Sequence, residues 1–171
     1  LFASMVNGGQ TSINGRLTAD IVLNDISNWE SWNETTAPAN SWTPIGSEAT
    51  QFAGTLDGDG HSVSGIYINS TADFQGLVGI LEEGGTLQDL GVKASYIKGG
   101  NQVGGVCGYN YHGTVTNCYN TGSVAGNIRV GGVCGMNYLD TVTNCYNPGS
   151  AEGNNYVAGV GGYNSVDTVT N

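Results

Sequence analysis

The stretch VGGVCGYNYHGTVTNCYNTGSVAGN at residues 103–127 is followed closely by VGGVCGMNYLDTVTNCYNPGSAEGN at residues 130–154. Glycines, cysteines and asparagines recur at the same places in both copies, and a partial third copy begins at Val157. Val103, Val130 and Val157 follow one another at a constant interval in the numbering (130 − 103 and 157 − 130). Self-similarity at a fixed period of about 20–50 residues is the sequence signature of stacked supersecondary units. This period therefore decides the fold class.

Each copy holds three short pieces rich in β-forming residues, VGGVCGYN, TVTNCYN and SVAGN, which glycine and asparagine separate. No helical apolar period runs over a useful length, and neither a leucine-rich framework nor the about 40 residues of a propeller blade is present. Short strands joined by tight corners make one coil of a parallel β-helix. The sequence predicts an all-β parallel β-helix (β-solenoid) with coils of about 27 residues. The coils are expected to start near residues 52, 74, 103, 130 and 157, the first two being looser copies.

The first fifty residues do not follow the repeat, and they contain all three tryptophans of the chain. Because the end of a solenoid exposes apolar core and unpaired strand edges, it needs an atypical cap. We expect residues 1–50 to form an N-terminal cap and an irregular first coil, in which RLTADIVL supplies a strand. Residues 51–171 are expected to form the repeats. The pattern stops at Asn171 in mid-copy, so we expect the solenoid to continue beyond this segment.

Stacking places equivalent residues above one another, about 4.8 Å apart, which is the spacing of hydrogen-bonded strands. Two columns of valine are expected to fill the core: Val103, Val130 and Val157, and Val115, Val142 and Val169. A third column, made of Asn117, Asn144 and Asn171, is expected at a corner. Asparagine tolerates the left-handed backbone conformation, and its amide can bond to neighbouring coils. We interpret this column as a structural asparagine ladder.

Composition excludes two classes of partner. Charged residues make up 11% of the chain, and 14 Asp and Glu stand against 4 Lys and Arg. Nucleic-acid binding needs a positive surface that displaces counterions, so no nucleic-acid partner is expected. The longest apolar runs are far shorter than the about 18 residues that span a bilayer, so no membrane insertion is expected.

Several motifs in the sequence resemble those of a known family. VGGVCGYN, GLVG, TVTNCYN and the lead-in WTPIGSEATQFAGTLDGDGHSVSGIYIN are similar to the GLUG-motif repeats of bacterial surface and secreted adhesin-like proteins. Such repeats also occur in accessory regions of some immunoglobulin A proteases. The resemblance covers roughly residues 10–171 and implies a right-handed parallel β-helix at the cell surface, with no chemistry assigned to the repeat. The third copy departs from the pattern at Ala158 and Gly161.

The four cysteines form two pairs, Cys107 with Cys118 and Cys134 with Cys145, with the same separation in each pair. They lack the closely spaced C-x2–4-C pairs of a structural zinc site. In the less regular copy that starts near residue 74, Val78 and Leu90 take the two cysteine positions. Because both positions become apolar together, contact between them across the coil interior is favoured. In an exported protein we expect disulfides within each pair; free thiols stacked as ladders are the alternative. If Val106 points inward, strict alternation turns Cys107 outward unless a glycine bends the strand.

No set of residues predicts catalysis. There are only two histidines, and the acidic and basic residues do not gather in the repeat. DGDGH at residues 57–61 resembles part of a calcium loop but lacks its final glutamate, so we interpret it as a glycine turn. We expect no catalytic, cofactor-binding or metal-ligating residues.

Tyrosine also repeats at the expected outer surface. Tyr111 and Tyr138 are separated by the interval of the repeat, and so are Tyr119 and Tyr146. Exposed aromatic ladders offer large area for stacking on sugars or for anchoring a protein. These four tyrosines are the candidate ligand platform; the alternative is that they only cover the sheet.

Together these features predict a non-catalytic structural or adhesive segment of a bacterial cell-surface or secreted protein, located outside the cell. It would act as a stiff spacer or adhesion surface toward a glycan or a surface protein of a host or neighbouring cell. A carbohydrate-binding or accessory module of a secreted hydrolase is the first alternative. A filament subunit is the second, because uncapped solenoid ends invite end-to-end self-association.

Overall fold

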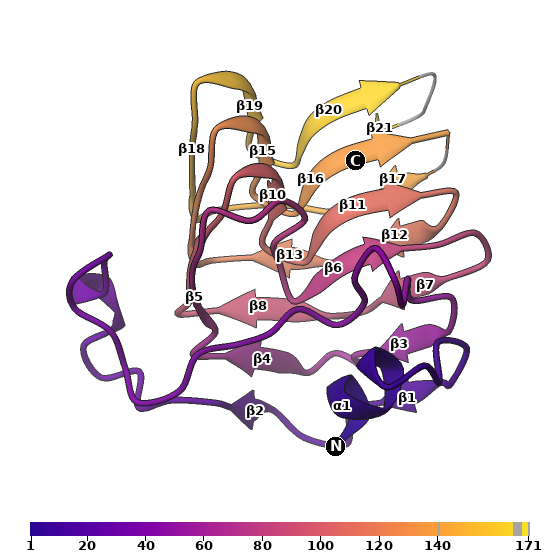
Figure 1. Cartoon of the computed structure of the whole chain (residues 1–171), viewed down its shortest axis with the longest axis horizontal. Helices are drawn as coiled ribbons and strands as arrows, with labels where there is room; N and C mark the ends of the chain where they lie inside the picture. The colour runs from indigo at the N-terminus through magenta and orange to yellow at the C-terminus, as the bar shows by residue number, and fades with distance from the viewer. Residues whose placement is uncertain (140, 166–168, 171) are drawn as a thin grey trace.

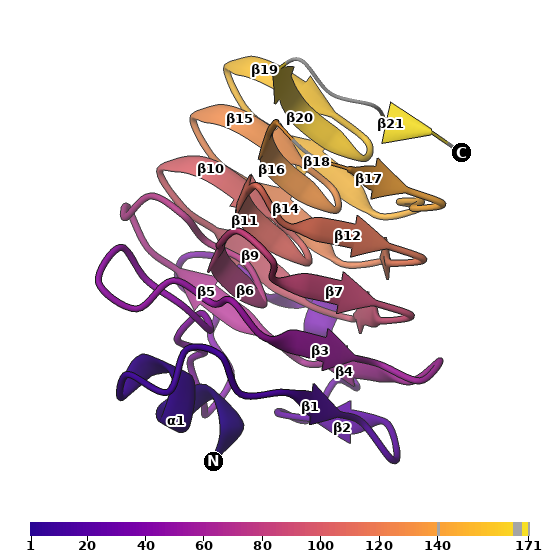
Figure 2. The ribbon, with the colours of Figure 1, turned by 90° about the vertical axis from the view of Figure 1, so that its right-hand side faces the viewer.

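The computed structural model describes residues 1–139, 141–165 and 169–170. The chain winds into stacked coils, with β1 at one end of the stack and β20 at the other (Figures 1 and 2). Equivalent strands of successive coils pair in parallel and form five sheets, which we call sheets A to E. The predicted parallel β-solenoid is confirmed, and so is the predicted length of its repeating coils.

Each sheet is given in the order of its hydrogen-bonded strands. Sheet A contains β1 (Gly15–Arg16), β3 (Thr55–Asp57), β7 (Thr86–Gln88), β12 (Thr114–Thr116), β17 (Val142–Thr143) and β21 (Val169–Thr170). Sheet B contains β13 (Tyr119–Asn120), β8 (Gly91–Lys93), β4 (Ser62–Ser64) and β2 (Ile21–Val22). Sheet C contains β20 (Gly161–Ser165), β16 (Cys134–Tyr138), β11 (Cys107–Tyr111) and β6 (Val78–Leu81). Sheet D contains β18 (Ser150–Glu152), β14 (Ser123–Ala125), β9 (Tyr96–Lys98) and β5 (Tyr67–Asn69). Sheet E contains β10 (Asn101–Gly104), β15 (Ile128–Gly131) and β19 (Asn155–Ala158).

One coil, from β11 to β15, holds five short strands rather than the three expected pieces. The piece TVTNCYN splits into β12 and β13 because Asn117 between them has a φ of 53°, a left-handed conformation that turns the chain. Asn144 has a φ of 51° at the same corner of the next coil. Asn171, the third expected member of this column, lies outside the described residues.

The repeat sets the register of the strands. Val103 pairs with Val130 and Val130 with Val157, so both steps keep the interval read from the sequence. The lower coils are longer, since Val78 pairs with Cys107 whereas Cys107 pairs with Cys134 (107 − 78 against 134 − 107). The register confirms that residues with the same place in successive copies lie above one another.

The lower members of both expected valine columns lie in the core, and the side chain of Val169 lies outside the described part of the chain. Val103, Val130, Val115 and Val142 are each fully buried, whereas Val157 in the uppermost coil is 40% exposed. Lower in the stack, large side chains such as Phe52 and Leu87 take the same interior space. Burying these side chains against their counterparts is the main apolar contribution to the fold.

A buried amide ladder crosses the interior beside sheet C. Asn110 donates from Nδ2 to Oδ1 of Asn137 at 2.7 Å and to the carbonyl oxygen of Gly113 at 2.7 Å. Its own Oδ1 accepts from the Gly113 N–H at 3.1 Å. Both asparagines are fully buried. Because the Asn110 amide bonds to the corner of its own coil and to Asn137 in the next coil, it fixes the corner and the stacking together.

A second ladder repeats this arrangement at the turn between sheets B and D. Nδ2 of the buried Asn120 donates to Oδ1 of Asn147 at 2.9 Å and to the carbonyl oxygen of Gly122 at 3.2 Å. The Gly122 N–H returns a bond to Asn120 Oδ1 at 3.0 Å. The repeated asparagines at these places are therefore structural.

The first coil is covered from below and from the side. Helix α1 (Phe2–Asn7) lies at the lower end of the stack (Figure 2). There Phe2 meets Phe52 edge to face with ring centroids 5.8 Å apart, and Val6 is fully buried. This helix closes part of the apolar core at the end where no lower coil exists.

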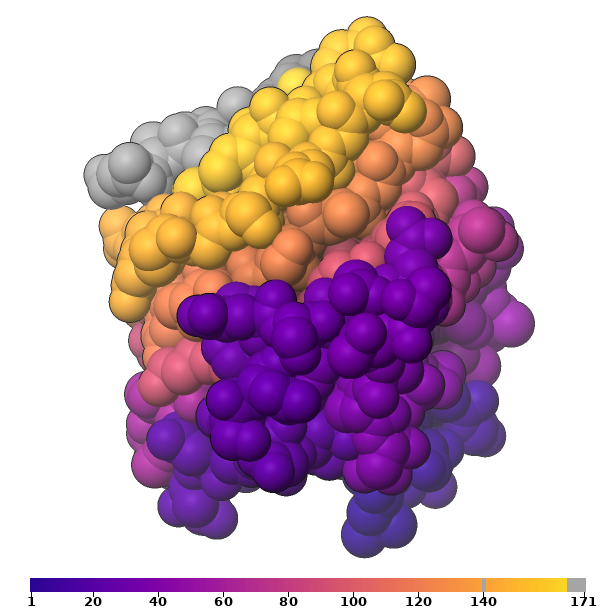
Figure 3. Space-filling view, turned by 90° about the vertical axis from the view of Figure 1, so that its left-hand side faces the viewer, coloured from indigo at the N-terminus to yellow at the C-terminus, as the bar shows by residue number. Residues whose placement is uncertain are grey.

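After β2 the chain leaves the stack and returns at Ile45, which bridges Val78. We call this segment, residues 23–44, the side loop; it includes a short 3-10 helix, Trp29–Ser31. Figure 3 shows the side loop as a raised indigo-to-violet layer over the lower coils, with the upper coils uncovered beside it. Within the side loop, Trp32 meets Tyr67 of sheet D edge to face, and Trp42 Nε1 donates to the Leu77 carbonyl oxygen at 3.1 Å.

Replacing Asn110 by alanine removes the amide that joins two coils and leaves the buried polar groups of Gly113 without partners. We expect the free energy of unfolding to fall by about 3 kcal/mol. Urea denaturation followed by circular dichroism measures this change. The matched control is Asn155→Ala at an exposed position of β19, for which we expect a loss below about 0.5 kcal/mol. Equal losses in the two variants would contradict the role of the ladder.

Candidate functional site

The tyrosines of the predicted platform form ladders on the outer surface. Tyr119 and Tyr146 stack with ring centroids 5.1 Å apart and planes 12° apart. On the other side of Tyr119, a Cβ atom on Gly91 would lie 2.2 Å from the ring, and Lys93 Nζ is 5.7 Å from its centroid. Both sides of the Tyr119 ring therefore have close neighbours, while Tyr146 is 56% exposed.

Sheet C carries the second ladder. Tyr111 and Tyr138 stack at 5.8 Å with planes 10° apart, and His112 meets both rings edge to face. Next to them, Phe74 and Tyr109 stack at 5.8 Å with planes 23° apart. Each stacked ring covers one face of its counterpart, and the register partner of Tyr138 in the next coil is Ser165.

A third aromatic column, on sheet D, was not singled out from the sequence. Tyr67 and Tyr96 are register partners and stack at 5.6 Å with planes 21° apart. The register partner of Tyr96 in the next coil is Ser123, and that of Ser123 is Ser150. The column thus ends at Tyr96, and no larger ring takes the place above it.

A surface cavity of about 560 Å³ lies at this step. We call it the Tyr96 ledge. Its lining includes Tyr96, Ser123, Glu34, Lys98, Asn127 and Glu152. The side loop supplies Glu34 on one side, and the upper coils supply Asn127 and Glu152 on the other.

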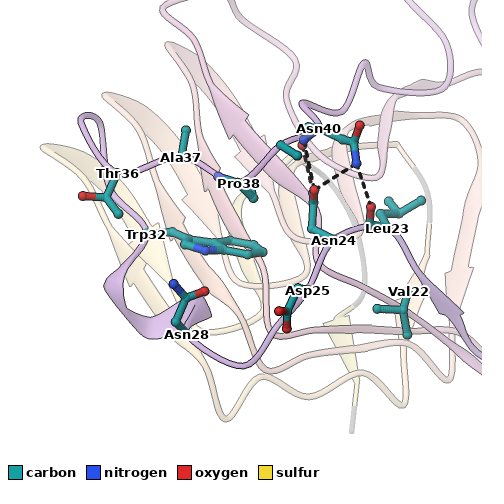
Figure 4. A pocket seen from close by; sticks show the side chains of 11 residues that line it. Val22, Leu23, Asn24, Asp25, Asn28, Trp32, Thr36, Ala37, Pro38 and Asn40 are labelled. Atoms are coloured by element: carbon teal, nitrogen blue, oxygen red, sulfur yellow. Dashed lines mark hydrogen bonds between the residues drawn. The ribbon is translucent and has the colours of Figure 1, made fainter.

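The side loop encloses a further pocket of about 500 Å³ (Figure 4). Asn24 holds its two ends together: Nδ2 donates to the Asn40 carbonyl at 2.8 Å, and Oδ1 accepts from the Asn40 N–H at 3.0 Å. Trp32 lies across the pocket with Pro38 and Asn28 nearby, yet its side chain is only 5% exposed. The indole therefore serves mainly to pack the loop rather than to offer a free face.

A shallow groove of about 390 Å³ follows the corner between sheets A and B. Asp59 forms an ion pair with Arg16 at 2.7 Å, and the hydrogen bond from this guanidinium lowers the pKa of Asp59. The Asp59 N–H donates to Asp57 Oδ1 at 2.8 Å, and Asp59 has a φ of 50°. DGDGH is thus a turn between β3 and β4. Across the described residues, no three His, Cys, Asp or Glu side chains are placed to hold a metal ion.

Asn117 lies at the rim of the same groove, where its Nδ2 donates to Oδ1 of Asp89 in the coil below at 2.8 Å. Asp89 has a φ of 51°, so it takes the corner position that asparagine takes in the next two coils. This contact gives the exposed corner column a structural use.

The structure pairs the cysteines along the stack rather than across each coil. All four are free thiols, which differs from the expected disulfides Cys107–Cys118 and Cys134–Cys145. Cys107 is the register partner of Cys134, and the Cys118 N–H donates to Sγ of Cys145 at 3.4 Å. Equal spacing within each pair thus reflects two stacked columns, which was the alternative arrangement.

Both Val106 and Cys107 are fully buried, so the strand does not alternate strictly at this point. The N–H groups of both residues donate to the same carbonyl oxygen of Val133, at 2.9 and 3.0 Å. Gly104 permits this bend, because a Cβ atom there would lie 2.1 Å from the Cys107 carbonyl oxygen. The VGGVCG glycines are therefore required where sheets E and C meet closely.

Burial raises the pKa of Cys107 well above its usual range, with the neighbouring Cys134 thiol adding to the effect. The pKa of Cys118 is also raised, first by its hydrogen bond with the Cys145 thiol and then by burial. Since the thiolate is the reactive form, these thiols are expected to be inert in the folded protein.

Comparisons with known proteins agree with this fold. The model of the GLUG motif family matches residues 99–125, so the resemblance to GLUG repeats is confirmed for that stretch. The chain is therefore a β-solenoid that carries a GLUG motif. Halomucin from Haloquadratum walsbyi is 39% identical over 116 residues, which cover 66% of this chain and 1% of halomucin.

A protein described as a Gly-rich membrane protein from Evansella cellulosilytica is 33% identical over 79 residues, or 44% of this chain and 9% of that protein. A crystal structure described as an immunoglobulin A1 protease from Bacteroides ovatus superposes with a TM-score of 0.62 and 16% identity. That match covers 98% of this chain and 61% of the solved one and shows a shared fold. The chain thus corresponds to only a small part of each curated relative. Within the described residues, no helix is long and apolar enough to cross a membrane.

The thiol assignment predicts slow alkylation. In the folded protein we expect all four cysteines to react with iodoacetamide at a small fraction of the rate of a free thiol, because they are buried. In urea all four should react, as intact-mass spectrometry would show. If the unfolded, unreduced protein took up no label, disulfides would be present and the stacked-thiol arrangement would be wrong.

Proposed function

We propose that this chain is a non-catalytic segment of an extracellular or cell-surface protein, where it acts as a stiff spacer that presents its lateral faces. The observation that carries this proposal is the unbroken register of sheet A, whose six strands run from β1 to β21. A main-chain hydrogen-bond ladder that continues through every coil resists bending between coils.

The interior supports the same reading. The core holds apolar side chains and amide ladders whose bonds join neighbouring coils. The relationship to halomucin and to a Gly-rich membrane protein supports a place at the cell surface. The shared fold with a structure described as an immunoglobulin A1 protease supports an accessory role beside other domains.

Stiffness can be measured by single-molecule fluorescence energy transfer. Dyes are attached to Ser12→Cys near the lower end and to Asn155→Cys in the upper coil, both exposed positions. We expect one narrow distribution, as narrow as that of the control pair Ser12→Cys and Glu48→Cys, which lies at the lower end alone. A broad or multiple distribution for the long pair would show that the coils bend or open, and would contradict the spacer role.

The non-catalytic part of the proposal has its own test. Purified chain incubated with immunoglobulin A1 is expected to leave the heavy chain intact on a denaturing gel. Cleavage that persists after repurification would assign catalysis to this segment and overturn the proposal.

A further inference from the structure

At the Tyr96 ledge an aromatic column ends beside a surface cavity. In sheet B the place above Tyr119 is taken by Tyr146, and in sheet C the place above Tyr111 is taken by Tyr138, whose own register partner in the next coil is Ser165. Above Tyr96 the register partner is Ser123, whose side chain is too short to cover a ring. Tyr96 and Ser123 both line the cavity, so space is left where a second ring would continue the column.

The walls of the ledge are rigid before any ligand arrives. Tyr67, directly beneath Tyr96, donates from its hydroxyl to the Asn33 carbonyl at 2.8 Å and meets Trp32 edge to face at 6.1 Å. Asn69 Nδ2 donates to the Glu34 carbonyl at 3.2 Å. These contacts anchor the side loop to sheet D, so binding would need little ordering of the chain.

The polar groups around the ring are carboxylates and amides. Lys98 and Glu34 form an ion pair, whose hydrogen bond raises the pKa of Lys98. Glu152 has no counterpart cation among the described ion pairs. At the rim, Asn154 Nδ2 donates to Asn127 Oδ1 at 2.9 Å. The ledge thus offers hydrogen-bond acceptors and donors with a net negative charge.

A pyranose ring fits this arrangement. Its C–H face packs on an aromatic ring, and its hydroxyl groups both donate and accept hydrogen bonds. Carboxylates at the ledge would repel a sulfated or carboxylated sugar, because Lys98, the cation in its lining, is already paired. We propose that the Tyr96 ledge is a binding subsite for a neutral sugar residue of a glycan chain, with the sugar stacked on the upper face of Tyr96.

This subsite goes beyond the spacer role and does not depend on it. The side-loop pocket and the corner groove offer a ligand less. The Trp32 face in the side-loop pocket is nearly closed to solvent, and the aspartates of the corner groove are held by Arg16 and by the turn itself. At the ledge, by contrast, Tyr96 and the short Ser123 that follows it in the next coil both line the cavity.

The test fills the ledge without removing any of its walls. In Ser123→Tyr the new ring would stack on Tyr96 as Tyr96 stacks on Tyr67, and so occupy the place of the sugar. Tyr156→Leu is the matched control, because it removes an exposed ring outside the lining of the ledge. Tyr96→Leu is a second variant, which keeps an apolar side chain over Tyr67 but removes the ring. Thermal denaturation checks that each variant is folded.

The probes are an array of neutral oligosaccharides ending in glucose, galactose, mannose or N-acetylglucosamine, together with sulfated and sialylated versions. We expect the unmodified chain and Tyr156→Leu to bind at least one neutral probe with equal affinity by calorimetry. Ser123→Tyr and Tyr96→Leu should each weaken that binding at least about tenfold. The proposal is overturned if no neutral probe binds, if the filled variant binds as well as the original, or if the anionic versions bind more tightly. None of these outcomes changes the energy-transfer result, so the spacer proposal stands or falls separately.

Discussion

Contact between a side chain and its counterpart one coil away is the interaction on which the rest of the structure depends. Val103 lies on Val130, Asn110 on Asn137 and Tyr111 on Tyr138, each joined by parallel main-chain pairing. A column of identical residues is stable only if its members tolerate one another at the spacing of adjacent strands. Apolar, amide and aromatic side chains meet this condition, whereas directly opposed like charges do not. This condition explains why a chain with few charges repeats valine, asparagine and tyrosine.

Much of this architecture could be predicted from the sequence, because the period of the repeat determines which residues of successive coils contact one another. The constant interval of the repeat places Val103 beneath Val130 whatever the local propensities are, and the pairing confirms it. The number of strands in a coil was less accessible. Asn117 divides one β-rich piece into two strands because its φ angle is positive, and the residue type alone does not determine that angle. The disulfides expected within each coil are absent from the structure for a related reason. Equal spacing within a coil looks the same whether two thiols face each other or each faces its own copy.

The side loop and the ledge show where prediction from repeats stops. The side loop has no counterpart in the other coils, so no alignment of copies positions its tryptophans. The ledge depends on the register of Tyr96, which lies above Tyr67 and beneath Ser123. Aligning the looser copy with the strict one could have revealed this broken column. The fact that the ring face borders a cavity walled by the side loop needed the structure. The regular columns form the stacked core and surface, and a surface cavity lies where the Tyr67–Tyr96 column ends at Ser123.

The stacking itself can be measured most directly by nuclear Overhauser contacts in isotopically labelled protein. Contacts are predicted between the methyl groups of Val103 and Val130 and between those of Val115 and Val142, with backbone contacts at the same separation along sheets C and E. If these contacts were absent, or linked residues at any other separation, the columns would not exist and the account built on them would be contradicted.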